Sequence, residues 1–217
     1  MFGLMDQFKC PRGRLGRFVA ALMNKGHKPL TMWGLKHVKI NPDYMILDVG
    51  CGGGKTVSQL AQKVPHGKVF GIDYSADMVE YSKKVNKKMI AENRVEIVEA
   101  SVVKMGFSED IFDLVTAVET YYFWPNFSDA LKEILRVLKP GGKFLMVNEM
   151  VKDGIYDVKS AKTIEKAHVV LIPLDEIKTT ALSVGFADVQ VFTKKDSPWN
   201  AVLTQKTVKK KKKLDLV

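Results

Sequence analysis

Residues 44–56, YMILDVGCGGGKT, join a short apolar run to a glycine-rich turn that ends in Gly-Lys-Thr. Such a turn, placed between a buried strand and a helix, commonly binds a nucleotide-like ligand, because a glycine backbone can approach the ligand closely. The stretch therefore predicts a strand of a buried sheet and a ligand site at its end. Several classes of nucleotide-like ligand could be bound by such a turn, and the spacing of the glycines distinguishes between the corresponding binding motifs.

The segments around the turn alternate between strand and helix patterns. Apolar runs predict strands at 45–50, 68–73, 94–100, 111–118 and 142–150, and helices are expected between them at 55–64, 75–92 (with Ser75 as N-cap) and 127–138. Two further helices are expected at 158–170 and 174–185, followed by neighbouring strands at 187–195 and 200–206. The order predicts an α/β protein with a Rossmann-like, doubly wound sheet, mostly parallel with one antiparallel C-terminal strand.

The two ends of the chain differ from this alternating middle. Residues 1–42 are expected to form an N-terminal helical lid, with one helix over 15–23, breakers at Gly26 and Pro29, and a second short helix opening at Thr31. Residues 43–206 are the expected main domain, and 207–217 a lysine-rich, disordered tail. Lys206, the five lysines at 209–213 and Asp215 together give +5 of the net charge of +10. The basic charge is thus local, and it makes a nucleic-acid partner unlikely.

The turn matches neither of two familiar nucleotide-binding motifs. A triphosphate loop requires G-x-x-x-x-G-K-[ST], but Val49 stands five positions before Gly54. A dinucleotide turn requires G-x-G-x-x-G, and its third glycine would fall on Lys55 or Val57. Both a nucleotide triphosphatase and a nicotinamide or flavin enzyme are therefore disfavoured.

The turn instead fits Asp-x-Gly-x-Gly-x-Gly, with Asp48 followed by Gly50, Gly52 and Gly54. An acid, Asp73, ends the second predicted strand, and "RVLKPGG" stands at 136–142. With these three motifs the chain resembles the class I S-adenosylmethionine-dependent methyltransferases. In style it is most similar to the small-molecule branch that includes the ubiquinone and menaquinone biosynthesis enzymes.

The resemblance implies S-adenosyl-L-methionine as cofactor and a set of residues around it. The backbone from Gly50 through Cys51 to Gly52 would pass against the methionine part, Asp48 would fix the turn, and Asp73 would bind the ribose hydroxyls. The remaining implied cofactor contacts are Gly54, Tyr74, Met78, Ser101, Val102 and Glu119. Ser101 departs from the family pattern, which often has Asp there, so the adenine contact depends more on the backbone of Val102.

The acceptor side is predicted from the end of the fourth strand, "AVETYYFWPNF" at 117–127. Ligands of open parallel sheets lie beyond the carboxyl ends of the strands, so we expect one or two of Glu119, Tyr121, Tyr122 and Trp124 to line the pocket. His27, between the breakers of the lid, is the candidate general base. No metal ligand set is predicted.

The resulting prediction is in-line methyl transfer to a small-molecule acceptor. Two rivals stay open: an RNA or protein methyltransferase that uses the basic tail, and a protein that binds S-adenosylmethionine without turnover. Cys10 and Cys51 give no disulfide framework, and neither a membrane span nor a signal peptide is evident, so a cytoplasmic setting is expected. The sequence fixes neither the acceptor atom nor the oligomeric state.

Overall fold

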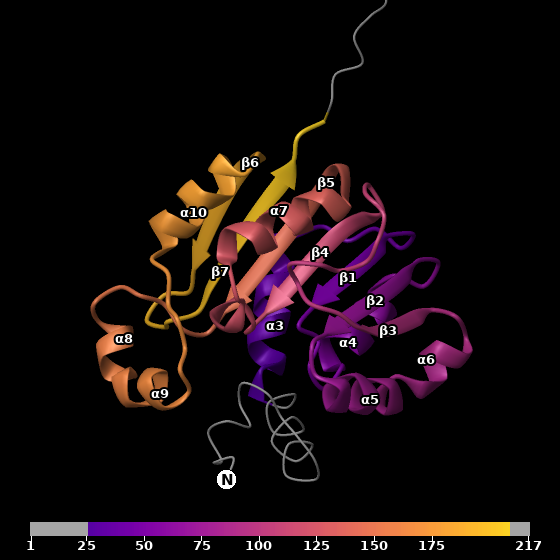
Figure 1. Ribbon diagram of the computed structural model, residues 1–217, viewed down its shortest axis with the longest axis horizontal. Coiled ribbons are helices and arrows are strands. Elements are labelled where there is room, and N and C mark those ends of the chain that lie inside the picture. Colours follow the sequence, from indigo (N-terminus) through magenta and orange to yellow (C-terminus); the bar gives the residue numbers. More distant parts are fainter. Residues whose placement is uncertain (1–25, 209–217) are drawn as a thin grey trace, which may run out of the picture.

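The computed structural model describes residues 26–208 of the 217-residue chain, and its centre is one seven-stranded sheet (Figure 1). The strand order is β3-β2-β1-β4-β5-β7-β6, in which β7 runs antiparallel to both of its neighbours and the other pairings are parallel. The predicted fold class is confirmed. The strands are β1 (Met45–Val49), β2 (Lys68–Asp73), β3 (Val95–Glu99), β4 (Phe112–Val118), β5 (Leu138–Asn148), β6 (Phe186–Thr193) and β7 (Asn200–Lys206).

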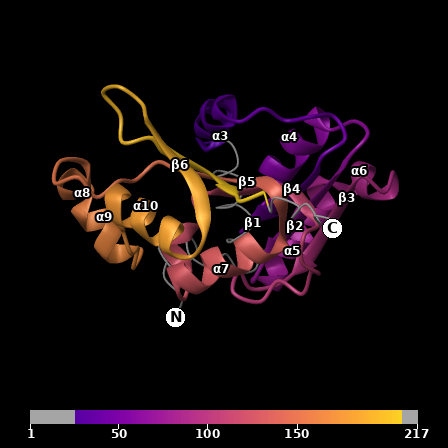
Figure 2. The same ribbon diagram turned by 90° about the horizontal axis from the view of Figure 1, so that it is seen from above.

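Helices cover both faces of this sheet, with α3 and α4 on one side and α7 and α10 on the other (Figure 2). The helix α7 buries one apolar stripe, formed by Ala130, Leu131, Ile134 and Val137. The helical elements are α3 (Lys28–Gly34), η1 (Leu35–His37), α4 (Lys55–Lys63), α5 (Ala76–Val85), α6 (Lys87–Ala91), η2 (Tyr121–Phe123), α7 (Phe127–Val137), α8 (Tyr156–Lys159), α9 (Ala161–Lys166) and α10 (Leu174–Ser183).

The strand order reverses at β1, which lies between β2 and β4. In open α/β sheets a crevice forms at such a reversal, beyond the carboxyl ends of the strands. The turn after β1, the acid that ends β2 and the segment after β4 all reach this crevice. The topology therefore gathers the residues that the sequence motifs had singled out.

Three predicted helices have different bounds in the structure. The helix expected over 75–92 is divided into α5 and α6 at Asn86, and the one expected over 158–170 is divided into α8 and α9 at Ser160. The helix expected to open at Thr31 begins at Lys28, because Pro29 lies in its first turn, where its missing N–H has no intrahelical partner to lose.

The described part of the predicted lid packs into the protein core. Leu30, Leu35 and Val38 are buried in the same apolar cluster as α4. Gly34 lies so close to Val147 of β5 that any side chain at position 34 would overlap it. The helix expected over 15–23 and most of the lysine tail lie outside the described residues, so the lid and the disordered tail stay predictions.

Candidate active site

The glycine turn follows β1 and leads into α4, and three of its four glycines have left-handed backbones. Gly50, Gly52 and Gly54 have φ angles of +68°, +48° and +76°, a region that side chains with a Cβ rarely adopt. A Cβ on Gly50 would lie 2.8 Å from Cβ of Thr120, whereas a Cβ on Gly52 would meet no atom within 4 Å. Gly52 thus faces open space at the mouth of the turn.

Gly54 has a different environment from the other two glycines. A Cβ there would lie 2.6 Å from Nδ2 of Asn86, and Ser82 of α5 is also in contact range. The Asn86 side chain donates hydrogen bonds of 3.0 Å to the carbonyls of Gly54 and Ser82. The absence of a side chain at Gly54 allows α5 to pack against the turn. Gly54 does not line the cavity that opens over the turn, described below, so its predicted cofactor contact has no geometric support.

Two buried carboxyl groups flank the turn. Asp73 accepts 2.9 Å hydrogen bonds from the backbone N–H groups of Gly52 and Ser75, one on each oxygen. Asp48 accepts a 2.7 Å hydrogen bond from the Thr116 hydroxyl. Burial raises the pKa of both groups, in Asp48 to about 7. The strand ends therefore present two carboxyl groups that no lysine or arginine of the described residues neutralises.

A first cavity of about 380 Å³ opens over the turn and these carboxyl groups. Most of the predicted cofactor residues line it, and Tyr74, which is half exposed, stands at its edge. Burial raises the pKa of the Cys51 thiol well above its usual value, so Cys51 stays a neutral thiol in this wall. The predicted lining residues are His27, Asp48, Gly50, Cys51, Gly52, Asp73, Tyr74, Met78, Ser101, Val102, Glu119 and Trp124.

The aromatic segment after β4 divides between cavity and core. Trp124 lines the first cavity, and its ring N–H donates a 2.9 Å hydrogen bond to the Thr120 hydroxyl. Tyr121 lies outside the cavity, because the short helix η2 turns its ring towards Phe127 and the core. The side chain of Tyr122 turns away from the first cavity and lines a second one.

This second cavity, of about 330 Å³, lies beside the first and shares its wall. His27, Glu119 and Phe123 line both cavities. The other walls are mainly apolar and come from the segment between β5 and α10, with Met150, Val151, Ile164, Ala167, Val169 and Leu171 among them. The sequence reasoning missed this segment because its short helices carry no motif.

Glu119 stands at the shared wall in a left-handed conformation, with φ of +59°. Its Oε1 accepts hydrogen bonds from the Tyr122 hydroxyl, at 3.0 Å, and from the backbone N–H of Glu149. Burial, with a contribution from Glu149, raises the pKa of Glu119 to about 8. Glu149 was not predicted, although its position directly after the fifth strand was the signal that could have identified it.

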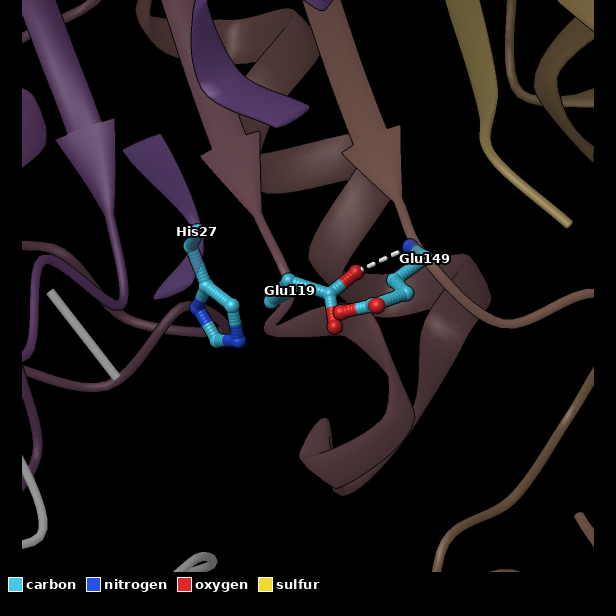
Figure 3. Close-up of side chains that lie close together, drawn as sticks. All are labelled: His27, Glu119 and Glu149. Atoms are coloured by element: carbon cyan, nitrogen blue, oxygen red, sulfur yellow. Dashed lines mark hydrogen bonds between the residues drawn. The ribbon is translucent and has the colours of Figure 1, made fainter. Parts of the chain in front are cut away.

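His27 precedes α3 and faces Glu119 and Glu149 across the shared wall (Figure 3). The backbone carbonyl of His27 accepts hydrogen bonds from the N–H and the hydroxyl of Thr31, both at 2.9 Å, which fixes the residue at the start of the helix. Burial lowers the pKa of the imidazole, so the neutral ring predominates at neutral pH.

Comparison with known proteins matches the central part of this chain to one protein family. Residues 47–146, which hold the glycine turn, Asp73 and the end of β4, match the family described as "Methyltransferase domain". Residues 47–146 are thus similar to this methyltransferase domain family. The segment that shapes most of the second cavity lies beyond these matched residues.

The curated relatives of this chain include quinone-biosynthesis enzymes, as the motif style had indicated. A demethylmenaquinone methyltransferase of Lactococcus lactis is 35% identical over 54% of this chain and 47% of its own length. A ubiquinone/menaquinone biosynthesis C-methyltransferase of Geotalea daltonii is 29% identical over 73% of this chain and 77% of its own. The chain spans about half the length of the first curated relatives it matches.

Solved structures with low sequence identity share the fold of this chain. Phosphoethanolamine N-methyltransferase 2 of Haemonchus contortus superposes with a TM-score of 0.78 at 18% identity, over 95% of this chain and 61% of that one. A putative methyltransferase of Haloferax volcanii gives a TM-score of 0.74 at 17% identity, over 88% and 97%. Among the described residues, the helices are too short or too polar to cross a membrane.

Proposed function

We propose that this protein transfers a methyl group from S-adenosyl-L-methionine to a small-molecule acceptor. The observation that carries the proposal is the pair of adjoining cavities, one over the glycine turn and one beyond it, which meet at His27, Glu119 and Phe123. Methyl transfer requires a donor and an acceptor held in line at van der Waals contact. Two cavities with a common wall provide that arrangement.

The residues of the first cavity fit S-adenosylmethionine chemically. The Asp73 carboxylate accepts backbone N–H groups of Gly52, Ser75 and Tyr74, and its roughly four acceptor sites leave room for a ribose hydroxyl. Asp48 is a buried carboxyl group without a cationic partner among the described residues, and the ammonium group of the cofactor would supply one. Met78 and Val102 offer apolar surface for the adenine ring.

When bound, the cofactor supplies an electrophilic methyl group on a sulfonium. The chain's own contribution is placement: the turn and the two aspartates hold the donor, and the apolar walls of the second cavity exclude water. An acceptor with an apolar body and one polar, reacting end matches this cavity. The polar end would lie at the shared wall, where a neutral His27 can act as a proton acceptor, as the sequence predicted, or as a metal ligand.

The curated relatives support an acceptor of this kind. The names of the cited relatives specify menaquinone and ubiquinone biosynthesis, and another relative, from Caenorhabditis elegans, is a sterol 4-C-methyltransferase at 28% identity. These acceptors combine large apolar bodies with a polar oxygen. We therefore propose an apolar acceptor that carries a hydroxyl or enol oxygen.

Calorimetric titration tests the cofactor. S-adenosylmethionine should bind and NAD should not, and Asp73→Ala should weaken S-adenosylmethionine binding by roughly 30- to 1,000-fold, because a charge-assisted contact to the ribose is lost. Glu80→Ala on the exposed side of α5 is the matched control and should bind like the wild type. Binding of NAD in place of S-adenosylmethionine would overturn the proposal.

Turnover separates the two rivals. Methyl transfer from methyl-labelled S-adenosylmethionine to a panel of apolar quinols and enols is expected, and a protein that only binds the cofactor would show none. A variant that ends at residue 207 lacks the lysine tail and should keep this activity. Transfer to RNA or protein that depends on the tail would instead support the macromolecular rival.

A further inference from the structure

Three potential metal-binding side chains converge at the shared wall from distant parts of the chain. His27 precedes α3, Glu119 follows β4, and Glu149 follows β5. One ligand atom from each residue lies within 4.8 Å of the other two. In Figure 3 the imidazole and the two carboxyl groups point towards one another across the wall.

The cluster lacks a positive partner within the described residues 26–208. Neither Glu119 nor Glu149 forms an ion pair with a lysine or arginine there. Without a counter-charge the ionised form of such carboxyl groups is disfavoured, and a cation bound between them would stabilise that ionised form. The electrostatics of the wall therefore favour a cation.

The hydrogen bonds of Glu119 leave one of its oxygens available to that cation. Oε1 is occupied by the Tyr122 hydroxyl and the Glu149 backbone N–H, whereas Oε2 receives no hydrogen bond from a described residue. The Tyr122 hydroxyl in turn accepts a 3.1 Å hydrogen bond from the backbone N–H of Met150. Glu119 is thus fixed by the support that metal-binding carboxylates usually have from neighbouring groups.

We propose that His27, Glu119 and Glu149 bind a divalent transition-metal ion at the wall between the two cavities. One imidazole nitrogen and two carboxylate oxygens suit Mn²⁺, Fe²⁺ or Zn²⁺ better than Mg²⁺, which prefers oxygen ligands alone. Three protein ligands also leave coordination positions open, as in catalytic rather than structural metal sites.

The open positions give the ion a role, which rests on the proposed methyl transfer. All three ligand residues line the second cavity, so an acceptor bound in that cavity could reach the ion. An acceptor oxygen bound there would be held beside the first cavity and would ionise more readily, since a bound cation stabilises the oxyanion. In this arrangement His27 is a ligand and not the general base that the sequence predicted.

Mn²⁺ binding to the full-length protein, followed by electron paramagnetic resonance without cofactor, tests the site. The wild type should bind one Mn²⁺ per chain, with Zn²⁺ as a competitor. Glu149→Gln and His27→Phe should each weaken binding about tenfold or more, because each removes one of three ligands. Glu165→Gln, an exposed carboxylate of α9, is the matched control and should bind like the wild type.

The proposal is overturned if Mn²⁺ does not bind at millimolar concentration, or if neither ligand variant weakens its binding. Titration of S-adenosylmethionine into the same variants separates this failure from failure of the proposed function. Loss of Mn²⁺ binding in Glu149→Gln, whose side chain lines the second cavity and not the first, with unchanged cofactor affinity supports the metal site. A wild type that binds S-adenosylmethionine but no Mn²⁺ refutes the metal site and leaves the methyltransferase proposal intact.

Discussion

The two cavities are built in different ways. The first is formed by the ends of the adjacent strands β1 and β2. It consists of a left-handed glycine turn and two side-chain carboxyl groups held at those strand ends. The second is framed by side chains from short helices outside the sheet, and Figure 1 shows α8 and α9 lying beyond its edge. Exposed apolar side chains, Ile155, Val158 and Val170, occur in that segment. The first cavity is thus built on the sheet itself, whereas the second depends on a segment outside the sheet.

The sharpest test of this difference compares two glycines of one motif. Gly54→Ala should lower the free energy of unfolding by about 2–5 kcal/mol, because its Cβ would overlap α5 in a left-handed backbone. Gly52→Ala should cost only about 1–2 kcal/mol, for the backbone conformation alone, yet weaken cofactor binding more. Urea denaturation and calorimetric titration measure the two effects. Equal losses of stability would show that Gly52 is also a packing position.

A pH titration of stability tests the buried carboxyl of the first cavity. With the pKa of Asp48 raised to about 7, the ligand-free folded state keeps a proton that the unfolded state releases from about pH 4 upward. The contribution of Asp48 to stability is therefore complete at low pH and is lost as the pH rises through about 7.

Asp48→Asn removes this dependence. Between pH 4 and 8 the wild type should lose about 2–4 kcal/mol of its free energy of unfolding relative to the variant. The amide oxygen of the variant can still accept the hydrogen bond from Thr116. Chemical denaturation across the pH range, without ligand, measures the difference. Parallel curves for the two proteins would mean that Asp48 is ionised at all these pH values.

The smallest effect on the fold is expected in the second cavity. Thr163→Trp places a large side chain on the cavity side of α9 and should raise the KM for an apolar acceptor roughly tenfold, while the affinity for S-adenosylmethionine stays the same. Lys162→Trp, on the same helix but outside the cavity, is the matched control. An equal effect of both substitutions on KM would remove the second cavity from acceptor binding.

The same contrast explains what the sequence could predict. Asp48, Gly52 and Asp73 belong to short motifs whose geometry follows from strand-end positions, so their place in the first cavity was predictable. Tyr121 and Tyr122 are adjacent residues that the turn of η2 sends to the core and to the second cavity, and no pattern in the sequence distinguishes them. Gly54 satisfies the motif, but its neighbours Ser82 and Asn86 come from a helix that only the folded structure brings close.

The segment between β5 and α10 offers a route to protein engineering. It supplies most of the second cavity, yet β5 pairs directly with β4 and β7, and the sheet is continuous without it. Loops on a stable scaffold tolerate replacement when the scaffold keeps its own hydrogen bonds. Chimaeras that exchange residues 150–173 between related chains would change acceptor selectivity on a constant donor half.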